Sequence, residues 1–296
     1  MAKVREMKEI LFILRDKELP EEVRRACEGL REEGIRCAAQ PAAAFIENAQ
    51  AAPSKREALY LTNDEAALAY LQKERLPVCG YAAQKEPLPP AFSKAPYLVT
   101  EPDEVGVADY EKIHARLTGR PWTILETPRT LVRETVEEDA DGLYACYDEE
   151  ALRYLEPLPE REAQLAAMRS YRETVYAFYG FGRWSILEKE TGAFVGYAGY
   201  EPYVKGEEAV SFGYLIHPAF RRQGYAEEVC RALLRYGADE LGFRRIRAVT
   251  HADNAASVGL LRKLGFVRTQ GIEKTEAGGS SERPLEEYCL TALQRV

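Results

Sequence analysis

One stretch, HPAFRRQGYAEEVCRALL (217–234), constrains the fold more than any other part of this sequence. It follows EAVSFGYLI (208–216), which alternates as a β-strand does, and it enters GYAEEVCRALLRYGADELG (224–242), whose apolar residues recur at helical spacing. Pro218 stops the strand, and Gly224 lets the backbone approach a ligand closely. Because a helix begins with unpaired N–H groups at the positive end of its dipole, this unit favours a bound phosphate or pyrophosphate. A plain strand-to-helix turn is the alternative.

The elements around this stretch define the second part of the chain. Its pattern gives the order of a β-hairpin, a central strand, a loop and a helix, followed by strand, helix and strand. In order we expect a strand at 130–136, helices at 137–152 and 160–180, a hairpin at 182–203, strands at 208–216 and 244–250, helices at 224–242 and 254–265, and a strand at 286–293.

The first third alternates between short apolar runs and helical patterns. Examples are the strand-like EILFILR (9–15) and the helix-like PEEVRRACEGLREEG (20–34), with Pro at its start and Gly at its end. Such alternation predicts a layered, Rossmann-like α/β domain with a mostly parallel sheet. We place the junction near 126–130, which gives a domain of unknown role at 1–128 and a second domain at 129–296.

Composition excludes several classes of function. The 296 residues carry a net charge of −8, so few cations are available for general nucleic-acid binding. The six cysteines include no CxxC pair, which favours reduced thiols and no metal site. The apolar run near the N-terminus is too short to span a membrane, and no cleavage site follows it. We therefore expect a cytoplasmic protein that binds neither nucleic acid nor membrane.

Three segments in the second part resemble a known family. RRQGYA (221–226) fits the pattern Arg/Gln-x-x-Gly-x-Gly/Ala, and NAASVGLLRKLGF (254–266) is similar to an Asn-x-x-Ser…Lys-x-Gly-Phe segment. EKETGAFVGYAGY (188–200) is similar to a central hairpin. Together they resemble the GNAT superfamily of N-acetyltransferases, in the subgroup that includes the ribosomal-protein N-terminal acetyltransferases. The resemblance covers 129–296. It implies a mixed-sheet α+β acyltransferase domain with acetyl-CoA as co-substrate.

The resemblance also implies where acetyl-CoA binds. Backbone amides across 222–226 would hold the pyrophosphate, and Asn254 and Ser257 would reach the pantetheine or the sulfur. As alternatives, Asn254 caps a helix and Ser257 is a small packing residue. The residues expected at the cofactor are Leu215, Ile216, Arg221, Arg222, Gln223, Gly224, Tyr225, Ala226, Asn254 and Ser257.

Two departures from the family pattern concern catalysis. Leu261 stands where many members have a tyrosine that protonates the departing thiolate, and Ser211 stands where the subgroup often has a glutamate. A thiolate is a tolerable leaving group, and Ser257 can assist it by hydrogen bonding. The remaining candidates for a general base are His251 and Glu208, with a structural role for His251, a water relay or an already neutral amine as alternatives.

Two further features remain open. Tyr179 and Phe181, in the aromatic stretch 171–185, are candidates to line the acceptor site, although core packing is the alternative. The N-terminal part faintly resembles a haloacid-dehalogenase-like domain, but Asp16 has no second aspartate two residues away. Phosphatase chemistry is therefore not expected there.

The sequence thus predicts an N-acetyltransferase that moves the acetyl group from the thioester to a primary amine by direct attack. The acceptor would be a small-molecule or peptide amine. A non-catalytic sensor of CoA or a related ligand is the alternative, favoured by the two departures, and a phosphohydrolase is a third reading that the missing aspartate pair disfavours. The acceptor's identity and the oligomeric state stay undetermined.

Overall fold

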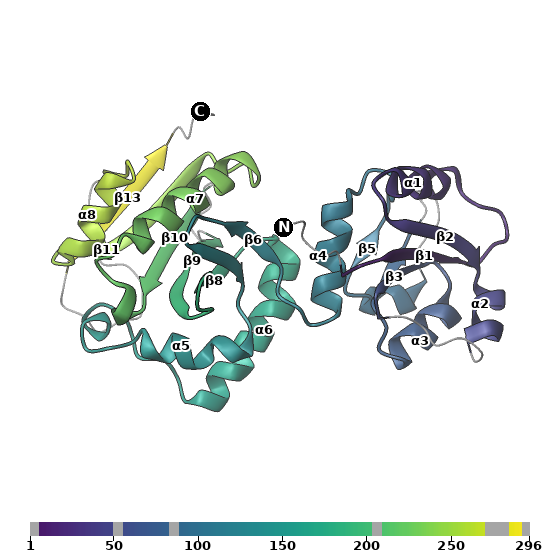
Figure 1. The fold of residues 1–296 in the computed structure, drawn as a ribbon, viewed down its shortest axis with the longest axis horizontal. Helices are drawn as coiled ribbons and strands as arrows, with labels where there is room; N and C mark the ends of the chain where they lie inside the picture. The colour runs from purple at the N-terminus through teal and green to yellow at the C-terminus, as the bar shows by residue number, and fades with distance from the viewer. Residues whose placement is uncertain (1–5, 50–55, 83–88, 203–208, 270–283, 292–296) are drawn as a thin grey trace. The chain divides into compact units, whose positions relative to one another are not determined.

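The computed structural model describes residues 6–49, 56–82, 89–202, 209–269 and 284–291. Contacts within the chain divide it into two compact units, Met1–Trp122 and Thr123–Val296 (Figure 1). Each unit has its own sheet and its own hydrophobic core. No helix in these described ranges is long and apolar enough to cross a membrane.

The first unit is built on a parallel sheet with the strand order β2-β1-β3-β4-β5. This is one of the two common orders of doubly wound α/β sheets, so the predicted layered α/β class is confirmed. Its elements are β1 (Glu9–Leu14), α1 (Glu21–Glu32), β2 (Arg36–Pro41), α2 (Ala42–Ala49), β3 (Ala58–Thr62), α3 (Glu65–Lys73), β4 (Val78–Tyr81), a 3₁₀ helix (Pro90–Lys94), β5 (Leu98–Val99) and α4 (Val107–Leu117).

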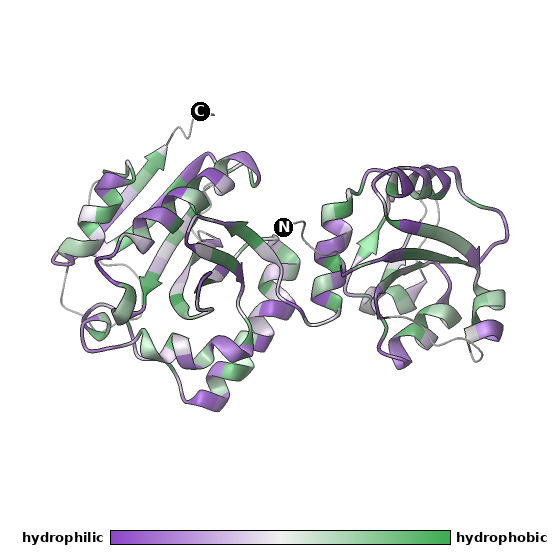
Figure 2. Cartoon of the chain, viewed as in Figure 1, coloured by the Kyte–Doolittle hydropathy of each residue, from purple (hydrophilic) through white to green (hydrophobic). Residues whose placement is uncertain are grey.

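Alternation along the strands produces a core on each face of this sheet. Phe12 and Leu61 pack with α1 and α4, whereas Ile13 and Tyr60 pack with α2 and α3. The central strands β3 and β4 are therefore buried at every residue, as expected for parallel strands covered on both faces. The helices carry both hydrophilic and hydrophobic residues, as Figure 2 shows along α1.

The second unit is built on an eight-stranded mixed sheet with the order β12-β13-β11-β10-β9-β8-β7-β6. Every neighbouring pair is antiparallel except β10–β11, which α7 connects, so the predicted mixed sheet is confirmed. Its elements are β6 (Thr123–Glu126), β7 (Thr130–Glu134), α5 (Ala140–Ala145), α6 (Arg161–Tyr179), β8 (Arg183–Glu188), β9 (Phe194–Pro202), β10 (Val210–Ile216), α7 (Tyr225–Asp239), β11 (Arg245–His251), α8 (Ala255–Lys263), β12 (Val267–Arg268) and β13 (Leu285–Thr291).

One predicted helix, at 137–152, is wrong. Only Ala140–Ala145 is α-helical, and short 3₁₀ helices lie on either side at Glu137–Asp139 and Ala151–Arg153. Where this helix ends, the Cys146 carbonyl oxygen accepts a hydrogen bond from Arg221 (3.4 Å), a residue 75 positions later in the sequence. The segment after the helix forms one wall of the site.

The core of the second unit lies between α7 and α8 and the sheet. Val229 and Leu233 of α7 pack with Phe212 and Ile246, and Trp184 is fully buried among them. Strand β10 is central in the sheet, so it positions both the loop that follows it and the groups on its other face.

Candidate active site

Strand β10 separates from β11 partway along its length. With β9 it pairs from Val210 through to Ile216, whereas with β11 it pairs only at Val210 and Ser211. Strand β11 nevertheless continues to His251 and stays paired with β13 throughout. The two parallel strands therefore enclose a V-shaped opening, with unpaired edges facing each other.

The register of β10 decides which backbone groups face this opening. The His217 N–H group donates to the Val195 carbonyl oxygen of β9 (2.8 Å). Because backbone groups alternate in direction along a strand, those of Leu215 point toward β9, and those of Tyr214 and Ile216 point into the opening. Leu215 and Ile216 were both expected at the cofactor. By this alternation, Ile216 directs its N–H group into the opening and Leu215 does not.

The loop after β10 ends in an anion-binding helix terminus. Arg222 and Gly224 both adopt positive φ (60° and 84°), and the chain then enters α7 at Tyr225. Within the described parts of the chain, the N–H groups of residues 222–227 donate to no protein acceptor. These free amides lie at the positive end of the α7 dipole, so they can bind a phosphate group. An added Cβ at Gly224 would lie 3.5 Å from the Arg129 guanidinium, so the position is accessible.

Arg129 braces this helix terminus, and no local sequence pattern indicates it. Its Nε donates to the Glu228 carboxylate (2.7 Å), its Nη1 donates to the Gln223 carbonyl oxygen (3.0 Å), and its guanidinium lies 4.0 Å from the centre of the Tyr225 ring. Burial acts to raise the pKa of Glu228, but hydrogen bonds from Thr127 and Arg129 lower it overall. The first-turn carboxylate is therefore neutralised by a partner and opposes an incoming phosphate less strongly.

Arg221 holds the fold together instead of pointing at the loop. Its Nε donates to the Ile216 carbonyl oxygen (3.0 Å), and its Nη atoms bind both oxygens of Asp148 (2.8 and 2.9 Å), Glu150 (3.0 Å) and the Cys146 carbonyl oxygen. These contacts use every N–H group that a guanidinium has. Arg222, by contrast, is exposed and makes no hydrogen bond or ion pair with a described residue.

The residues expected near the sulfur meet at the start of α8. The Asn254 side chain accepts from the Ser257 N–H group (3.1 Å), so it caps the helix. The Ser257 hydroxyl accepts from the Tyr214 hydroxyl, 3.4 Å away, which comes from β10 across the opening. Burial raises the pKa of Tyr214 to about 12. Leu261, only 1% exposed, packs in the core and leaves no polar group at its position.

His251 lies at the open end of the V, as the last residue of β11. Its ring packs 5.6 Å from that of Tyr154, and its Nδ1 is buried with no hydrogen-bond partner among the described residues. The segment 146–154 thus contacts β10 through Arg221 and β11 through Tyr154, and it forms a wall across the opening. Glu208, the second candidate base, lies outside the described residues.

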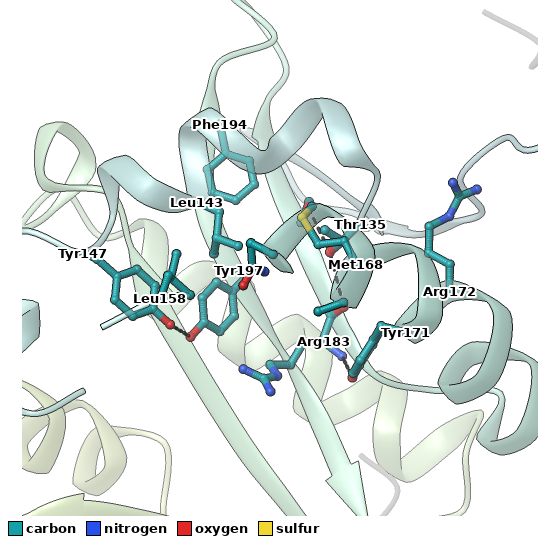
Figure 3. Close-up of a pocket in the computed structure, with 13 residues that line it drawn as sticks. Thr135, Leu143, Tyr147, Leu158, Met168, Tyr171, Arg172, Arg183, Phe194 and Tyr197 are labelled. Carbon is teal, nitrogen blue, oxygen red and sulfur yellow. Dashed lines mark hydrogen bonds between the residues drawn. The ribbon is translucent and has the colours of Figure 1, made fainter. Parts of the chain in front are cut away.

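A cavity of about 280 Å³ lies between α5, α6 and the sheet (Figure 3). Neither Tyr179 nor Phe181 lines it: Tyr179 is 43% exposed, and the Phe181 ring packs 5.0 Å from that of Phe243. The aromatic residues of the cavity are instead Tyr147, Tyr171, Phe194 and Tyr197.

Sequence reasoning missed most of these lining residues, although Tyr171 and Tyr197 lie inside segments that it singled out. In the described part of the molecule, no group of three or more His, Cys, Asp or Glu side chains could hold a metal ion. The site therefore consists of a helix terminus, an open strand edge and an aromatic cavity.

Comparisons with known proteins agree with this geometry. The model of the family "Acetyltransferase (GNAT) domain" matches residues 129–267. "Uncharacterized N-acetyltransferase YoaA" of Bacillus subtilis is 34% identical over 49% of this chain and 83% of its own length. "Uncharacterized protein YkkB" of the same organism is 27% identical over 51% of this chain and 90% of its own length.

Solved structures show the same fold. One named "Probable acetyltransferase" has a TM-score of 0.50 and 16% identity, and covers 58% of this chain and 96% of its own. The chain therefore belongs to the GNAT family of acetyltransferases, which use acetyl-CoA as co-substrate.

Proposed function

We propose that the second unit is an N-acetyltransferase that moves the acetyl group of acetyl-CoA directly to a primary amine. The observation that supports this most strongly is the meeting of the open edge of β10 with the free amides of residues 222–227. The free amides suit a phosphate group, and the open edge of β10 suits an extended chain. The two features are consecutive in the sequence, as a long ligand with a pyrophosphate and a pantetheine arm requires.

The residues present fit that ligand. The amides at the start of α7 would hold the pyrophosphate, and the exposed Arg222 would add positive charge beside them. The Ile216 N–H group, directed into the opening, would bind the acyl oxygen, where a fixed donor stabilises developing negative charge. The thioester itself supplies an activated acetyl group whose leaving group is a thiolate.

Proton transfer at the sulfur would involve Ser257. Leu261 cannot donate a proton, but the Ser257 hydroxyl lies at the start of α8 with the Tyr214 hydroxyl behind it (3.4 Å). The raised pKa of Tyr214 keeps this phenol protonated at neutral pH, so it can act as a donor to Ser257. In the transfer, the amine nitrogen bonds to the acyl carbon as the carbon–sulfur bond breaks, and the departing thiolate takes a proton.

His251 is the candidate in the described residues for removing a proton from the amine. It stands at the open end of the V, where an acceptor would enter, and its Nδ1 has no protein partner there. A His251→Gln variant that keeps acetyl-CoA binding but lowers kcat by about 100-fold or more would support this role. An unchanged kcat would favour an amine that arrives already neutral.

Acetyl-CoA binding provides the first test. Acetyl-CoA should raise the melting temperature of the wild type, and Gly224→Glu should abolish that rise, because a carboxylate would stand among the phosphate-binding amides. Gly242→Glu is the matched control, since Gly242 also has positive φ (69°) and open space but is far from α7's first turn. Both variants carry similar backbone strain, of about 1–3 kcal/mol, so only the ligand response should differ.

Release of CoA thiol with a panel of primary amines then separates an enzyme from a sensor. Transfer to any amine supports the proposal. Binding of acetyl-CoA with no thiol release across the panel would instead support the non-catalytic sensor.

A further inference from the structure

The cavity between α5, α6 and strands β8 and β9 is large enough for a small aromatic compound (Figure 3). Its volume of about 280 Å³ exceeds that of apolar protein cavities of roughly 150 Å³, which take up benzene. One aromatic ring and a short polar arm would therefore fill it. It also approaches the lower end of the range for small-molecule sites, about 300–1,000 Å³.

The lining of the cavity is aromatic and apolar, and it contains no acid. Four rings come from Tyr147, Tyr171, Phe194 and Tyr197. The other lining residues are four apolar side chains, three uncharged polar ones and two arginines: Leu143, Leu158, Ala167, Met168, Thr135, Gln164, Ser185, Arg172 and Arg183. Among the described residues, none that lines the cavity carries a carboxylate. An ammonium group would therefore find no counter-charge there, and a compound with several ammonium groups would be poorly accommodated.

The buried carboxylate of Asp139, which lies behind the lining residue Ser185, is already engaged. Asp139 binds Arg133 through both oxygens (2.7 Å each) and accepts from the Ser185 hydroxyl (2.7 Å) and the Val136 N–H group (3.0 Å). These contacts orient Ser185 at the cavity wall and compensate the negative charge of Asp139.

Positive charge at the cavity comes from Arg172 of α6 and, beside the tyrosine hydroxyls, from Arg183, the first residue of β8. Its guanidinium lies 5.8 Å from the centre of the Tyr197 ring, and Figure 3 shows it directed toward the end where the Tyr147 and Tyr197 hydroxyls meet. It also pairs with Glu201 (2.6 Å), but both side chains are close to half exposed. Such an ion pair is weak, so the guanidinium can bind a second carboxylate in its place.

One position without a side chain, Gly213, lies on β10 between the cavity and the open strand edge. Tyr197 of β9 lies directly opposite Leu215 of β10, and Gly213 is two residues earlier on the same face. Gly213 is exposed although β10 is a central strand, and an added Cβ would meet no atom within 4 Å. An amine held in the cavity can therefore pass over Gly213 toward the groups of Tyr214 and Ile216.

Resting on the proposed function, we propose that this cavity is the acceptor subsite and that it binds a primary amine with one aromatic ring and a carboxylate. This is the chemistry of an aromatic α-amino acid. The ring would lie among the tyrosines and Met168, the carboxylate would bind Arg183, and the amine would face the open edge of β10. A polyamine would be excluded, because the described lining offers no acid.

Binding of 4-fluoro-L-phenylalanine, followed by fluorine NMR, tests the cavity without any turnover. Ala167→Trp should weaken binding by at least about tenfold, because Ala167 lines the cavity. Ala166→Trp is the matched control, since it is the adjacent exposed residue of α6 and does not line the cavity. Equal binding by the two variants, or displacement of the probe by spermidine, would overturn the inference.

Acetyl transfer provides a second and separate readout. Wild-type kcat/KM should be higher for L-phenylalanine than for spermidine. Gly213→Leu should lower kcat/KM for L-phenylalanine by about tenfold or more, whereas Gly213→Ala should change it little. Arg183→Met should lower kcat/KM for L-phenylalanine. It should leave kcat/KM unchanged for 2-phenylethylamine, which lacks the carboxylate.

The two proposals fail in different ways. Binding of the fluorinated probe without transfer to any amine would keep the cavity assignment and refute the transferase. Efficient transfer to spermidine that is insensitive to Ala167→Trp would keep the transferase and refute the cavity assignment.

Discussion

An Arg221→Met variant should unfold more easily than the wild type while still responding to acetyl-CoA. All N–H groups of the Arg221 guanidinium donate hydrogen bonds, to the Ile216 and Cys146 carbonyl oxygens and to the carboxylates of Asp148 and Glu150. It therefore ties the end of β10 to the segment that carries Tyr147, and it has no donor left for a pyrophosphate. Melting curves with and without acetyl-CoA measure both effects at once.

Arg221→Met should lower the free energy of unfolding by about 2 kcal/mol. Hydrogen bonds between charged groups contribute about 1.5–3 kcal/mol when well shielded. Here the side chains of Arg221 and Asp148 are 22% and 34% exposed, so solvent screens the ion pair. Its contribution to stability is therefore nearer the lower end of that range. For a unit of this size, about 2 kcal/mol corresponds to roughly 4–8 °C in melting temperature.

The loss should also depend on pH. The hydrogen bond from Arg221 lowers the pKa of Asp148 below its usual value. The stabilisation is therefore fully present above the pKa of an unfolded aspartate, about 3.9, and disappears as the pH falls through the lower folded pKa. The difference in melting temperature between wild type and Arg221→Met should be constant from neutral pH down to about 5 and shrink below about 4.

Arg222→Met is the control, because Arg222 is the adjacent exposed arginine. It should melt like the wild type but show a smaller rise with acetyl-CoA. The reasoning would be refuted if Arg221→Met kept its unliganded melting temperature and lost more than about tenfold in acetyl-CoA affinity. Arg221 would then bind the co-substrate directly.

Three further outcomes are expected. Gly196→Ala should lower the free energy of unfolding, measured with denaturant, by about 2–4 kcal/mol. Its Cβ would lie 2.1 Å from the Leu215 carbonyl oxygen of β10, and Gly196 has a φ of 151°. A decrease below about 1 kcal/mol would contradict the clash. Tyr214→Phe and Ser257→Ala should each slow acetyl transfer without changing acetyl-CoA binding, and the double variant should be no slower than the worse single one; additive losses would argue for independent roles. Oxidised glutathione should form a disulfide between Cys27 and Cys37, whose Sγ atoms lie 2.6 Å apart. The two thiol hydrogens and electrons pass to the glutathione, which is reduced to two thiols. Mass spectrometry should detect the disulfide in the wild type, and its absence would contradict the prediction.

The strand, loop and helix around Gly224 could be predicted because each depends on local pattern. Alternation marks β10, helical spacing marks α7, and a glycine at positive φ joins them. The same local reasoning failed at 137–152, where helix-forming residues are present but the α-helix covers only Ala140–Ala145 and the segment beyond it is bound by the distant Arg221. Tertiary contacts override helix propensity at such positions.

Residue roles that depend on distant partners could not be predicted. Arg129 binds the Gln223 carbonyl oxygen across 94 positions in the sequence, and nothing near Arg129 indicates this. Arg221 was expected at the cofactor because of its neighbours in the sequence, but its partners Asp148 and Glu150 belong to another segment. Charge and position alone do not tell whether an arginine is free or already paired.

The sequence by itself determined most of the order of the elements, the strand, loop and helix around Gly224 and the resemblance to GNAT acetyltransferases, because periodicity and glycine placement are local properties of the chain. Only the tertiary structure decided that β10 separates from β11 after Ser211, that Ile216 and not Leu215 faces the gap, and that a cavity without acids lies beside Gly213. Strand register and cavity shape arise from packing between segments far apart in the sequence, and no local pattern records them.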